Sequence, residues 1–196
     1  SSIAVRTNSE ELLRVLRPHM TPEQLREASS YAVALANRAV REAASSTPEC
    51  SNMGTTLVAA VSYTDGTVIS NVGDSRAYHI TEGGIVRVTR DHSLVEDLVE
   101  RGELTPDQAR THPHKNLITR ALGADPELRA DLFRQKLNEG DFLLLCSDGL
   151  SNVVSEQEIL YEVIHGGEAC TCCRRLLDIA LHRGAPDNVT AVLIQC

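Results

Sequence analysis

The sequence predicts an α+β fold in which antiparallel sheets pack together and are flanked by helices. Three patterns predict it: helical periodicity up to about Ala44, short apolar runs separated by turn residues from Leu57 to Thr89, and an apolar run at Phe142–Cys146 that is bounded by turn formers and too short for a helix. Apolar residues occupy both alternating sets of positions in Leu57–Val61, so this strand should be buried on both faces. We therefore expect a sandwich of two sheets with helices outside it.

The composition is typical of a soluble globular protein and predicts one domain, residues 1–196. Of the 196 residues, 42% are hydrophobic and 23% are charged. The net charge of -8 and the aromatic content of 3%, with no Trp, argue against a nucleic-acid partner, which would need a basic surface or stacking side chains. No apolar run approaches the roughly 20 residues of a membrane-spanning helix, and the polar start does not resemble a signal peptide.

The six cysteines do not indicate a small disulfide-rich scaffold, and a reducing, cytoplasmic location fits them best. Cys170, Cys172 and Cys173 form a CTCC segment, for which a zinc site is one interpretation. The spacing is not CxxC, however, and no second Cys/His pair follows nearby. We therefore favour the interpretation that these cysteines are small apolar residues on a helix.

The chain up to about Ala44 is predicted to be helical. An N-cap signal at Thr7–Glu11 precedes a short helix, and Thr21–Gln24 forms a capping box with Pro in the first helical position, which should start a long helix. Apolar residues at helical spacing mark the core-facing stripe of the long helix: Leu25, Ala28, Ala32, Leu35, Ala36 and Val40. The composition then shifts to a linker over Ser45–Ser51.

Short strands follow the linker, and we interpret them as an antiparallel meander. A hairpin turn at Thr64–Gly66 is flanked by apolar runs, and Gly73–Arg76 and Thr81–Gly84 break the pattern again. The predicted strands cover residues 57–61, 67–72, 77–80 and 85–89.

The second half of the chain begins with a polar stretch, residues 90–113, which is predicted to be a small helical excursion on the surface with a capping box at Thr105–Gln108. A third capping box at Ser155–Glu158 should start a helix that stops at Gly166. The other predicted elements are a loop at 112–116, a short apolar segment at 117–122, strands at 128–133, 142–146 and 189–194, and a helix over about 168–183.

Asp148 directly follows the predicted strand Phe142–Cys146 and is itself followed by Gly149. An Asp-Gly pair allows a sharp turn, which would leave the carboxylate at the end of the strand, where a metal ion or an anionic substrate could meet it. The alternative is that Asp148 belongs to a turn that caps the next helix. This stretch alone leaves both interpretations open.

Asp74, Asp148 and Asp187 share one local context, because each lies at the edge of an apolar strand beside small or turn-forming residues. Asp74 and Asp148 follow their strands and Asp187 precedes one, so neighbouring antiparallel strands could bring all three to the same end of a sheet. Carboxylates gathered in this way would repel one another unless a cation lay between them. Oxygen ligands favour Mg²⁺ or Mn²⁺ over Zn²⁺. A turn remains the alternative for each Asp taken singly.

Six blocks occur in the order and approximate spacing of the bacterial metal-dependent serine/threonine protein phosphatases of the PPM, or 2C, type, and the chain resembles that family over nearly its whole length from Asn52 on. Together the blocks are highly specific, although none would suffice alone. They are NMGTT, NVGDSRAY, TRDHSLVEDLVERGELTPDQA, LITRALG, GDFLLLCSDGL and GAPDNVTAVLI.

The resemblance implies a four-layer α-β-β-α sandwich of antiparallel sheets with a metal cluster at one end. It implies that Asp148 binds metals at the cluster, that Asp187 binds the second metal of the central pair, and that Asp74 and Asp148 together hold a third, weaker metal. Asp148 and Asp187 are thus the expected catalytic residues, and Asn188 should lie near the site. A complete domain would hold two or three Mn²⁺ or Mg²⁺ ions.

The implied reaction is hydrolysis of phosphoserine or phosphothreonine in proteins by a hydroxide that bridges two metals and attacks phosphorus in line. The proteins expected as partners are substrates of a Ser/Thr kinase. The bound metals would reverse the local sign of charge and so admit a dianionic substrate to an acidic protein. Residues 90–113, with His92 and Ser93, resemble the family's flap, which borders the cleft. His92 resembles a flap or structural residue, and direct catalysis by it is the less favoured alternative.

Family members also begin with strands that carry a phosphate-contacting Arg, a NEDA-like block and a DGMGGH-like block, whose Asp bridges the two central metals and whose His is proposed as general acid. None of these occurs here, and SSIAV resembles the segment directly after the last block. We therefore expect an N-terminally truncated, partial domain that lacks the bridging ligand and could be inactive alone. The absent strands would leave a sheet edge uncovered, which predicts self-association.

Two hypotheses remain as alternatives to a phosphatase. In the first, the chain is a non-catalytic phosphatase-like module that binds a partner or one metal, and an upstream DGMGGH-type block would distinguish the phosphatase from this module. In the second, the chain is an unrelated sandwich-fold scaffold with three coincidental Asp turns.

Overall fold

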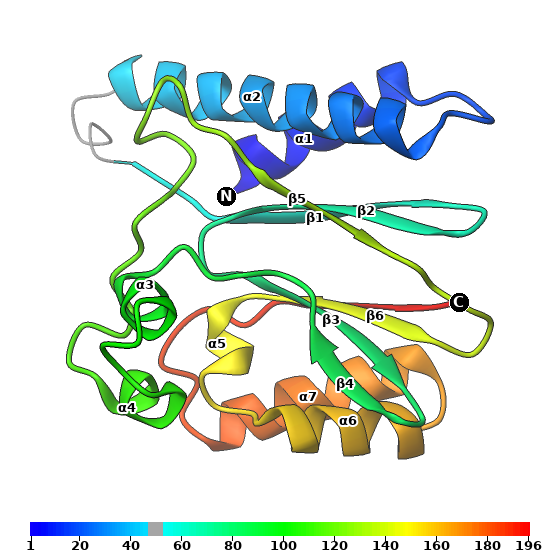
Figure 1. The fold of residues 1–196 in the computed structure, drawn as a ribbon, viewed down its shortest axis with the longest axis vertical. Helices are drawn as coiled ribbons and strands as arrows, with labels where there is room; N and C mark the ends of the chain where they lie inside the picture. Colours follow the sequence, from blue (N-terminus) through cyan, green and yellow to red (C-terminus); the bar gives the residue numbers. More distant parts are fainter. Residues whose placement is uncertain (47–52) are drawn as a thin grey trace.

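The computed structural model describes residues 1–46 and 53–196 and has four layers (Figure 1). Helices α1 (Ser2–Val15) and α2 (Pro22–Ser46) cover one sheet, of strand order β1-β2-β5, and α6 and α7 cover a second sheet, of order β4-β3-β6-β7. The α-β-β-α prediction is therefore confirmed. The strands are β1 (Leu57–Tyr63), β2 (Gly66–Val72), β3 (Arg76–Thr81), β4 (Gly84–Arg87), β5 (Asp131–Gln135), β6 (Phe142–Cys146) and β7 (Ala191–Gln195). The other helices are α3 (Leu94–Glu100), α4 (Pro106–Thr111), α5 (Asp148–Ser151), α6 (Glu156–His165) and α7 (Ala169–His182).

Strand β6 shows how the layers are held together. Leu144 is fully buried against the α6 and α7 side, whereas its neighbour Leu143 is buried between the two sheets. Successive side chains of a strand point to opposite faces, so a continuous apolar run such as β6 fills two cores at once. A third core joins α1 and α2 to the first sheet: Ala4, Val33, Ala36, Val40, Leu57, Val72 and Leu122.

The capping boxes predicted from the sequence form. Thr105 and Ser155 accept from the main-chain N–H groups of Gln108 and Glu158, whose side chains accept in return from the N-cap N–H groups. The start of α1 differs from the prediction, because the helix begins at Ser2 and runs through the Thr7–Glu11 signal. Asn8, expected to be part of the helix start, is buried within α1, so tertiary packing overrides the local signal.

The predicted meander is wrong, because the chain leaves the first sheet after β2 and enters the second sheet at β3. Strands β1 and β2 pair with each other, as do β3 and β4, but β2 pairs next with β5 and β3 with β6. The change of sheet takes place at Gly73, where φ is 103° and an added Cβ would lie 2.3 Å from Cγ2 of Thr56. Only glycine fits this close approach without strain.

Segment boundaries differ in smaller ways. The predicted strand at 128–133 begins only at Asp131, and the apolar segment 117–122 forms isolated bridges at Ile118 and Leu122 instead of a strand. Most of the predicted linker and Asn52 of the NMGTT block lie outside the described residues. In the described ranges, the helices are all too short or too polar to cross a membrane.

Candidate active site

The three candidate aspartates lie at one end of the second sheet. Asp74 comes shortly before β3, Asp148 directly after β6, and Asp187 shortly before β7. These strands are antiparallel neighbours, and the register pairs Cys146 with both Arg76 and Ala191, so the chain ends that carry the aspartates adjoin one another. Helices α3, α4 and α5 gather at this end of the sandwich (Figure 1).

Hydrogen bonds and a close approach of two backbones hold the Asp148 and Asp187 segments together. The Ser147 hydroxyl donates to the main-chain oxygen of Asn188 at 3.0 Å and accepts from the Thr190 N–H at 3.0 Å. The Ser147 N–H also donates to the Thr190 oxygen at 3.1 Å. A Cβ added at Gly149 would lie 2.5 Å from the Asn188 oxygen, so the two backbones approach more closely than a side chain would permit.

The electrostatic environment opposes ionisation of two of these carboxyls. Burial, and then the negative charge of Asp148, raises the pKa of Asp74 from 3.8 to about 6. Burial, and then the negative charge of Asp187, raises the pKa of Asp148. Arg76 acts in the opposite direction on both carboxyls. Asp148 therefore lies close enough to Asp74 and to Asp187 for charge repulsion within each pair, which a cation bound between the carboxylates would relieve.

A cleft of about 540 Å³ opens beside these residues. Asp74 and Asp148 line it, together with α3 and α4 on one side and the segment from α5 to the start of α6 on the other. Asp187 is exposed and does not line this cleft, although its charge acts on Asp148. The alternative in which Asp148 helps to cap the next helix is not observed, because Asp148 is the first residue of the short helix α5 and the N-cap is Ser147.

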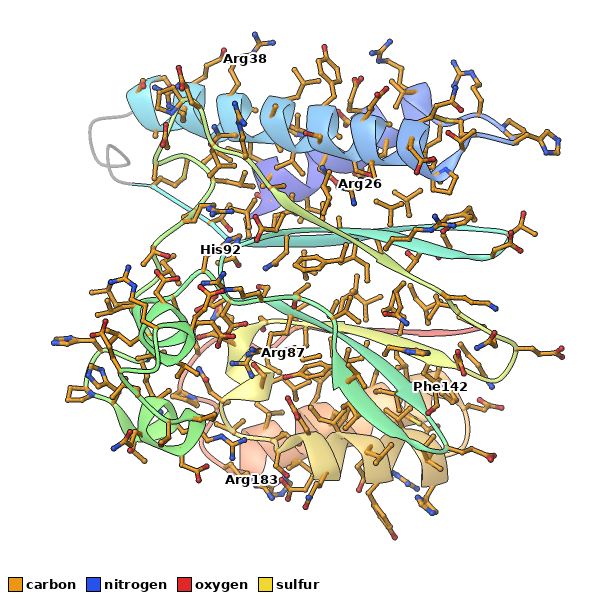
Figure 2. The ribbon with its side chains drawn as sticks, in the orientation of Figure 1. Arg26, Arg38, Arg87, His92, Phe142 and Arg183 are labelled. Carbon is orange, nitrogen blue, oxygen red and sulfur yellow. The ribbon has the colours of Figure 1, made fainter. Side chains whose placement is uncertain are left out.

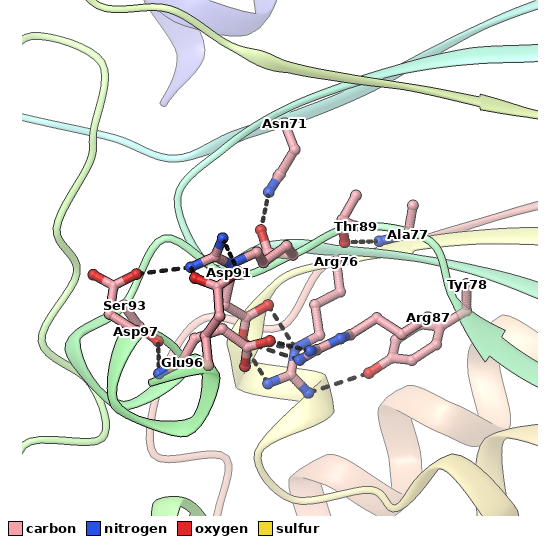
Figure 3. A network of polar contacts seen from close by, with 12 residues as sticks. Asn71, Arg76, Ala77, Tyr78, Arg87, Thr89, Asp91, Ser93, Glu96 and Asp97 are labelled. Atoms are coloured by element: carbon pink, nitrogen blue, oxygen red, sulfur yellow. Dashed lines mark hydrogen bonds and ion pairs between the residues drawn. The ribbon is translucent and has the colours of Figure 1, made fainter. Parts of the chain in front are cut away.

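Asp91 is the centre of an ion-pair network among residues that line the cleft (Figure 3). Arg76 donates to both oxygens of Asp91 at 2.6 to 3.0 Å and to the Tyr78 hydroxyl at 3.2 Å. Burial raises the pKa of Tyr78 to about 12, so the hydroxyl stays protonated. Arg87 pairs with both Asp91 and Glu96, which ties β4 to α3. The sequence alone does not indicate this network, because Asp91 stands in a polar stretch without periodicity.

His92 connects the flap to the turn that carries Asp74, and it lies at the end of the sheets from which α3 and α4 project (Figure 2). The ring Nδ1 of His92 accepts from the Gly73 main-chain N–H at 3.0 Å, and the main-chain N–H of His92 donates to the Gly73 oxygen at 2.9 Å. Because Nδ1 is an acceptor, the ring proton of the neutral imidazole is on Nε2, which lies 3.1 Å from Asp131. The geometry fits the structural role expected for His92.

We predict that His92→Ala lowers the free energy of unfolding by about 2 kcal/mol, because the buried Gly73 N–H loses its acceptor. Urea denaturation of both proteins measures the difference. His92→Asn, whose amide can take over part of the bonding of Nδ1, should recover a measurable part of the loss. Equal stability of all three proteins would mean that His92 does not hold the turn.

The carboxylate oxygens of Asp74, Asp148 and Asp187 fit a hard divalent cation that keeps several water molecules as ligands. Within the residues that the structure describes, no group of three or more His, Cys, Asp or Glu side chains is placed to hold a metal ion, which holds for the CTCC segment as well. Mg²⁺ and similar ions commonly use only one or two carboxylates and several waters. The repelling pairs Asp74–Asp148 and Asp148–Asp187 offer that number of oxygen ligands.

Comparison with known proteins gives a consistent result. The sequence model of the family described as "Protein phosphatase 2C" matches residues 1–171. The chain is 38% identical over 162 residues to the serine/threonine protein phosphatase PstP of Mycobacterium tuberculosis, a match that covers 83% of this chain and 31% of that protein. The chain thus spans about a third of the length of this curated relative.

Solved structures share the fold. Serine/threonine phosphatase Stp1 from Staphylococcus aureus has a TM-score of 0.91 and 36% identity, and the match covers 99% of this chain and 77% of Stp1. The catalytic domain of PstP in complex with 2 manganese ions has a TM-score of 0.83 and 32% identity, over 98% of this chain and 80% of that domain.

Proposed function

The chain belongs to the protein phosphatase 2C family, and we propose that it provides the cleft and three carboxylate ligands for the metal-dependent hydrolysis of phosphoserine and phosphothreonine in proteins. The observation that carries this proposal is the gathering of Asp74, Asp148 and Asp187 at one end of the second sheet, beside a cleft large enough for a phosphorylated side chain. The manganese complex of the related PstP domain supports Mn²⁺ as the cofactor, with Mg²⁺ as the alternative.

Asp148 and Asp187 would hold the central ions, and Asp74 together with Asp148 a weaker one. When bound, the ions would activate a water for attack on phosphorus and neutralise the phosphoryl oxygens. The amide of Asn152 donates to Oδ2 of Asp148 at 3.2 Å and so orients this carboxylate. The Asn188 N–H does the same for Oδ1 of Asp187 at 2.7 Å. Residues 90–113 would act as the flap of a single domain, bordering the cleft and controlling access to it.

Burial of the Asp74 carboxyl, together with the charge of Asp148, predicts a pH dependence of the stability of the metal-free protein. Because the folded pKa of about 6 exceeds the usual 3.8, the folded chain binds more protons than the unfolded chain between these values, and this residue lowers stability as the pH rises through that window. At pH 7, Asp74→Asn should therefore raise the free energy of unfolding by about 1 kcal/mol, after allowance for partial exposure.

Urea unfolding at pH 4 and pH 7, in EDTA, measures this effect. The advantage of Asp74→Asn should appear at pH 7 and be absent at pH 4, where the wild-type carboxyl is protonated in the folded state. A variant that is less stable than the wild type at pH 7 would contradict the conclusion that burial and the charge of Asp148 disfavour the ionised Asp74.

The proposed activity is tested by release of phosphate from a phosphoserine peptide with Mn²⁺, with EDTA as the control. Turnover that EDTA abolishes supports the phosphatase. A non-catalytic phosphatase-like binding module is the second candidate, and it is favoured by the lack of any metal-holding group of three His, Cys, Asp or Glu among residues 1–46 and 53–196. Saturable peptide binding without turnover would support that candidate.

We further propose that the chain acts on substrates of a Ser/Thr kinase in the cytoplasm and self-associates through exposed strands. Strand β7 is at the edge of its sheet, and its Val192 is 49% exposed. An apolar edge strand with free main-chain groups favours pairing with another chain. Sedimentation that shows only monomer at high concentration would contradict self-association.

A further inference from the structure

We propose that the segment Arg110–Lys115 at the end of the flap binds an anionic group of the substrate beside the phosphorylated residue. This inference rests on the proposed function and adds a substrate class to it. The preferred substrates would be phosphoproteins that carry an acidic side chain, or a second phosphorylated residue, close to the phosphate in the site.

The charge of this segment differs from that of the rest of the protein. The chain has a net charge of -8, yet the sequence from Arg110 to Lys115 contains an Arg, two His and a Lys and no acidic residue. Lys115 is one of only two lysines in the chain. The segment begins in the last turn of α4, a helix without a buried residue, so the fold itself does not require this set of side chains.

Both ends of the segment face the cleft that holds the candidate site. Arg110 and Lys115 line the cleft together with Asp74 and Asp148. The cleft therefore has carboxylates at one end, where the cations would bind, and permanent positive charge on the flap. A substrate with anionic groups on neighbouring residues would complement both parts.

Arg110 and Lys115 differ from the other cationic side chains of the cleft in whether they form ion pairs. Arg76 is held by Asp91, and Arg87 by Asp91 and Glu96. In the described part of the chain, no ion pair involves Arg110 or Lys115, and both side chains are exposed. Their charge is thus available to a ligand, whereas that of Arg76 and Arg87 is used within the protein.

The opposite wall does not neutralise the flap. Glu158, which lines the cleft at the start of α6, is paired with Arg183 at 2.5 Å and also accepts from Ser155. Glu96 is paired with Arg87. Glu156 is the remaining acidic side chain of the α6 wall. Away from Asp74, Asp91 and Asp148, the two cations Arg110 and Lys115 outnumber Glu156, so the net unpaired charge of the cleft is positive, as an anionic flanking group requires.

Binding of labelled peptides to this chain in Mn²⁺, followed by fluorescence anisotropy, tests the inference. Each peptide carries a non-hydrolysable phosphonate in place of phosphoserine, and its flanking residues are Ala, Asp, or a second phosphonate. We expect at least one anionic peptide to bind about five-fold more tightly than the Ala peptide, because two exposed charge pairs contribute modestly. The preference should shrink as the salt concentration rises.

The variant R110Q/K115Q should lose this preference, and R174Q/K136Q, which removes the same charge outside the cleft, should retain it. A gain with the Asp peptide alone identifies a carboxylate as the ligand, and a gain with the second phosphonate alone identifies a phosphoryl group. Equal binding of all three peptides, no binding of any, or a preference that survives in R110Q/K115Q would overturn the inference.

Phosphate release from the matching phosphoserine peptides, measured in parallel, separates this inference from the proposed function. A binding preference without hydrolysis would contradict the phosphatase and leave the anionic subsite standing. Hydrolysis of all peptides at equal rates, with equal affinities, would support the phosphatase and contradict the anionic subsite.

Discussion

Asp148→Asn is expected to lower Mn²⁺-dependent phosphate release by at least about 100-fold, because this carboxylate is the one shared by both repelling pairs. Removal of its charge leaves Asp74 and Asp187 without the neighbour that would complete either proposed cation site. The rate with a phosphoserine peptide at saturating Mn²⁺ measures the effect.

The loss in this variant should not come from unfolding. Burial and the charge of Asp187 raise the pKa of Asp148, so a neutral side chain is better tolerated than the carboxylate in the metal-free protein. The oxygen of an Asn side chain can still accept from Asn152. Asp178→Asn, at an exposed position on α7, is the matched control. A variant that keeps its activity and its fold would contradict the assignment of Asp148.

Gly149→Ala should lower the free energy of unfolding by about 3 kcal/mol, despite the better helix propensity of Ala. An added Cβ would lie 2.5 Å from the Asn188 oxygen and 3.3 Å from the Asp187 oxygen, and both are main-chain atoms that cannot rotate away. The Ser147–Asn188 contact would open, and Asp148 would move away from Asp187. Urea denaturation measures the loss.

Gly83→Ala is the matched control, because its Cβ would meet only the Thr81 hydroxyl, at an ordinary 3.5 Å. The control should be nearly as stable as the wild type. If Gly149→Ala were equally stable and bound Mn²⁺ unchanged, the close approach of the two segments would not be what positions the carboxylates.

The elements that the sequence predicts well are those defined by local chemistry. Capping boxes at Thr105 and Ser155 depend on residues three apart, and the strand Phe142–Cys146 on an unbroken apolar run. The meander was wrong because the same turn residues at Gly73 serve either a hairpin or a change of sheet. Which of these occurs depends on the distant contacts with Thr56 and His92.

For the candidate site as well, the sequence predicted the features that depend on local chemistry and not those that depend on distant contacts. Aspartates at strand ends could be located from the sequence, since antiparallel neighbours bring such ends together. The Arg76–Asp91–Arg87 network could not, because its partners meet only once β3, β4 and the flap have folded. The sequence also did not indicate that Asp187 is exposed and lies outside the cleft that Asp74 and Asp148 line.

The central claim is that these carboxylates gather to bind a divalent cation, and calorimetric titration of this chain with Mn²⁺ tests it most directly, independently of turnover. We expect saturable binding of at least one ion per chain, weakened at least about ten-fold in Asp148→Asn and unchanged in Asp178→Asn. No binding by the wild type, or equal binding by Asp148→Asn, would contradict it.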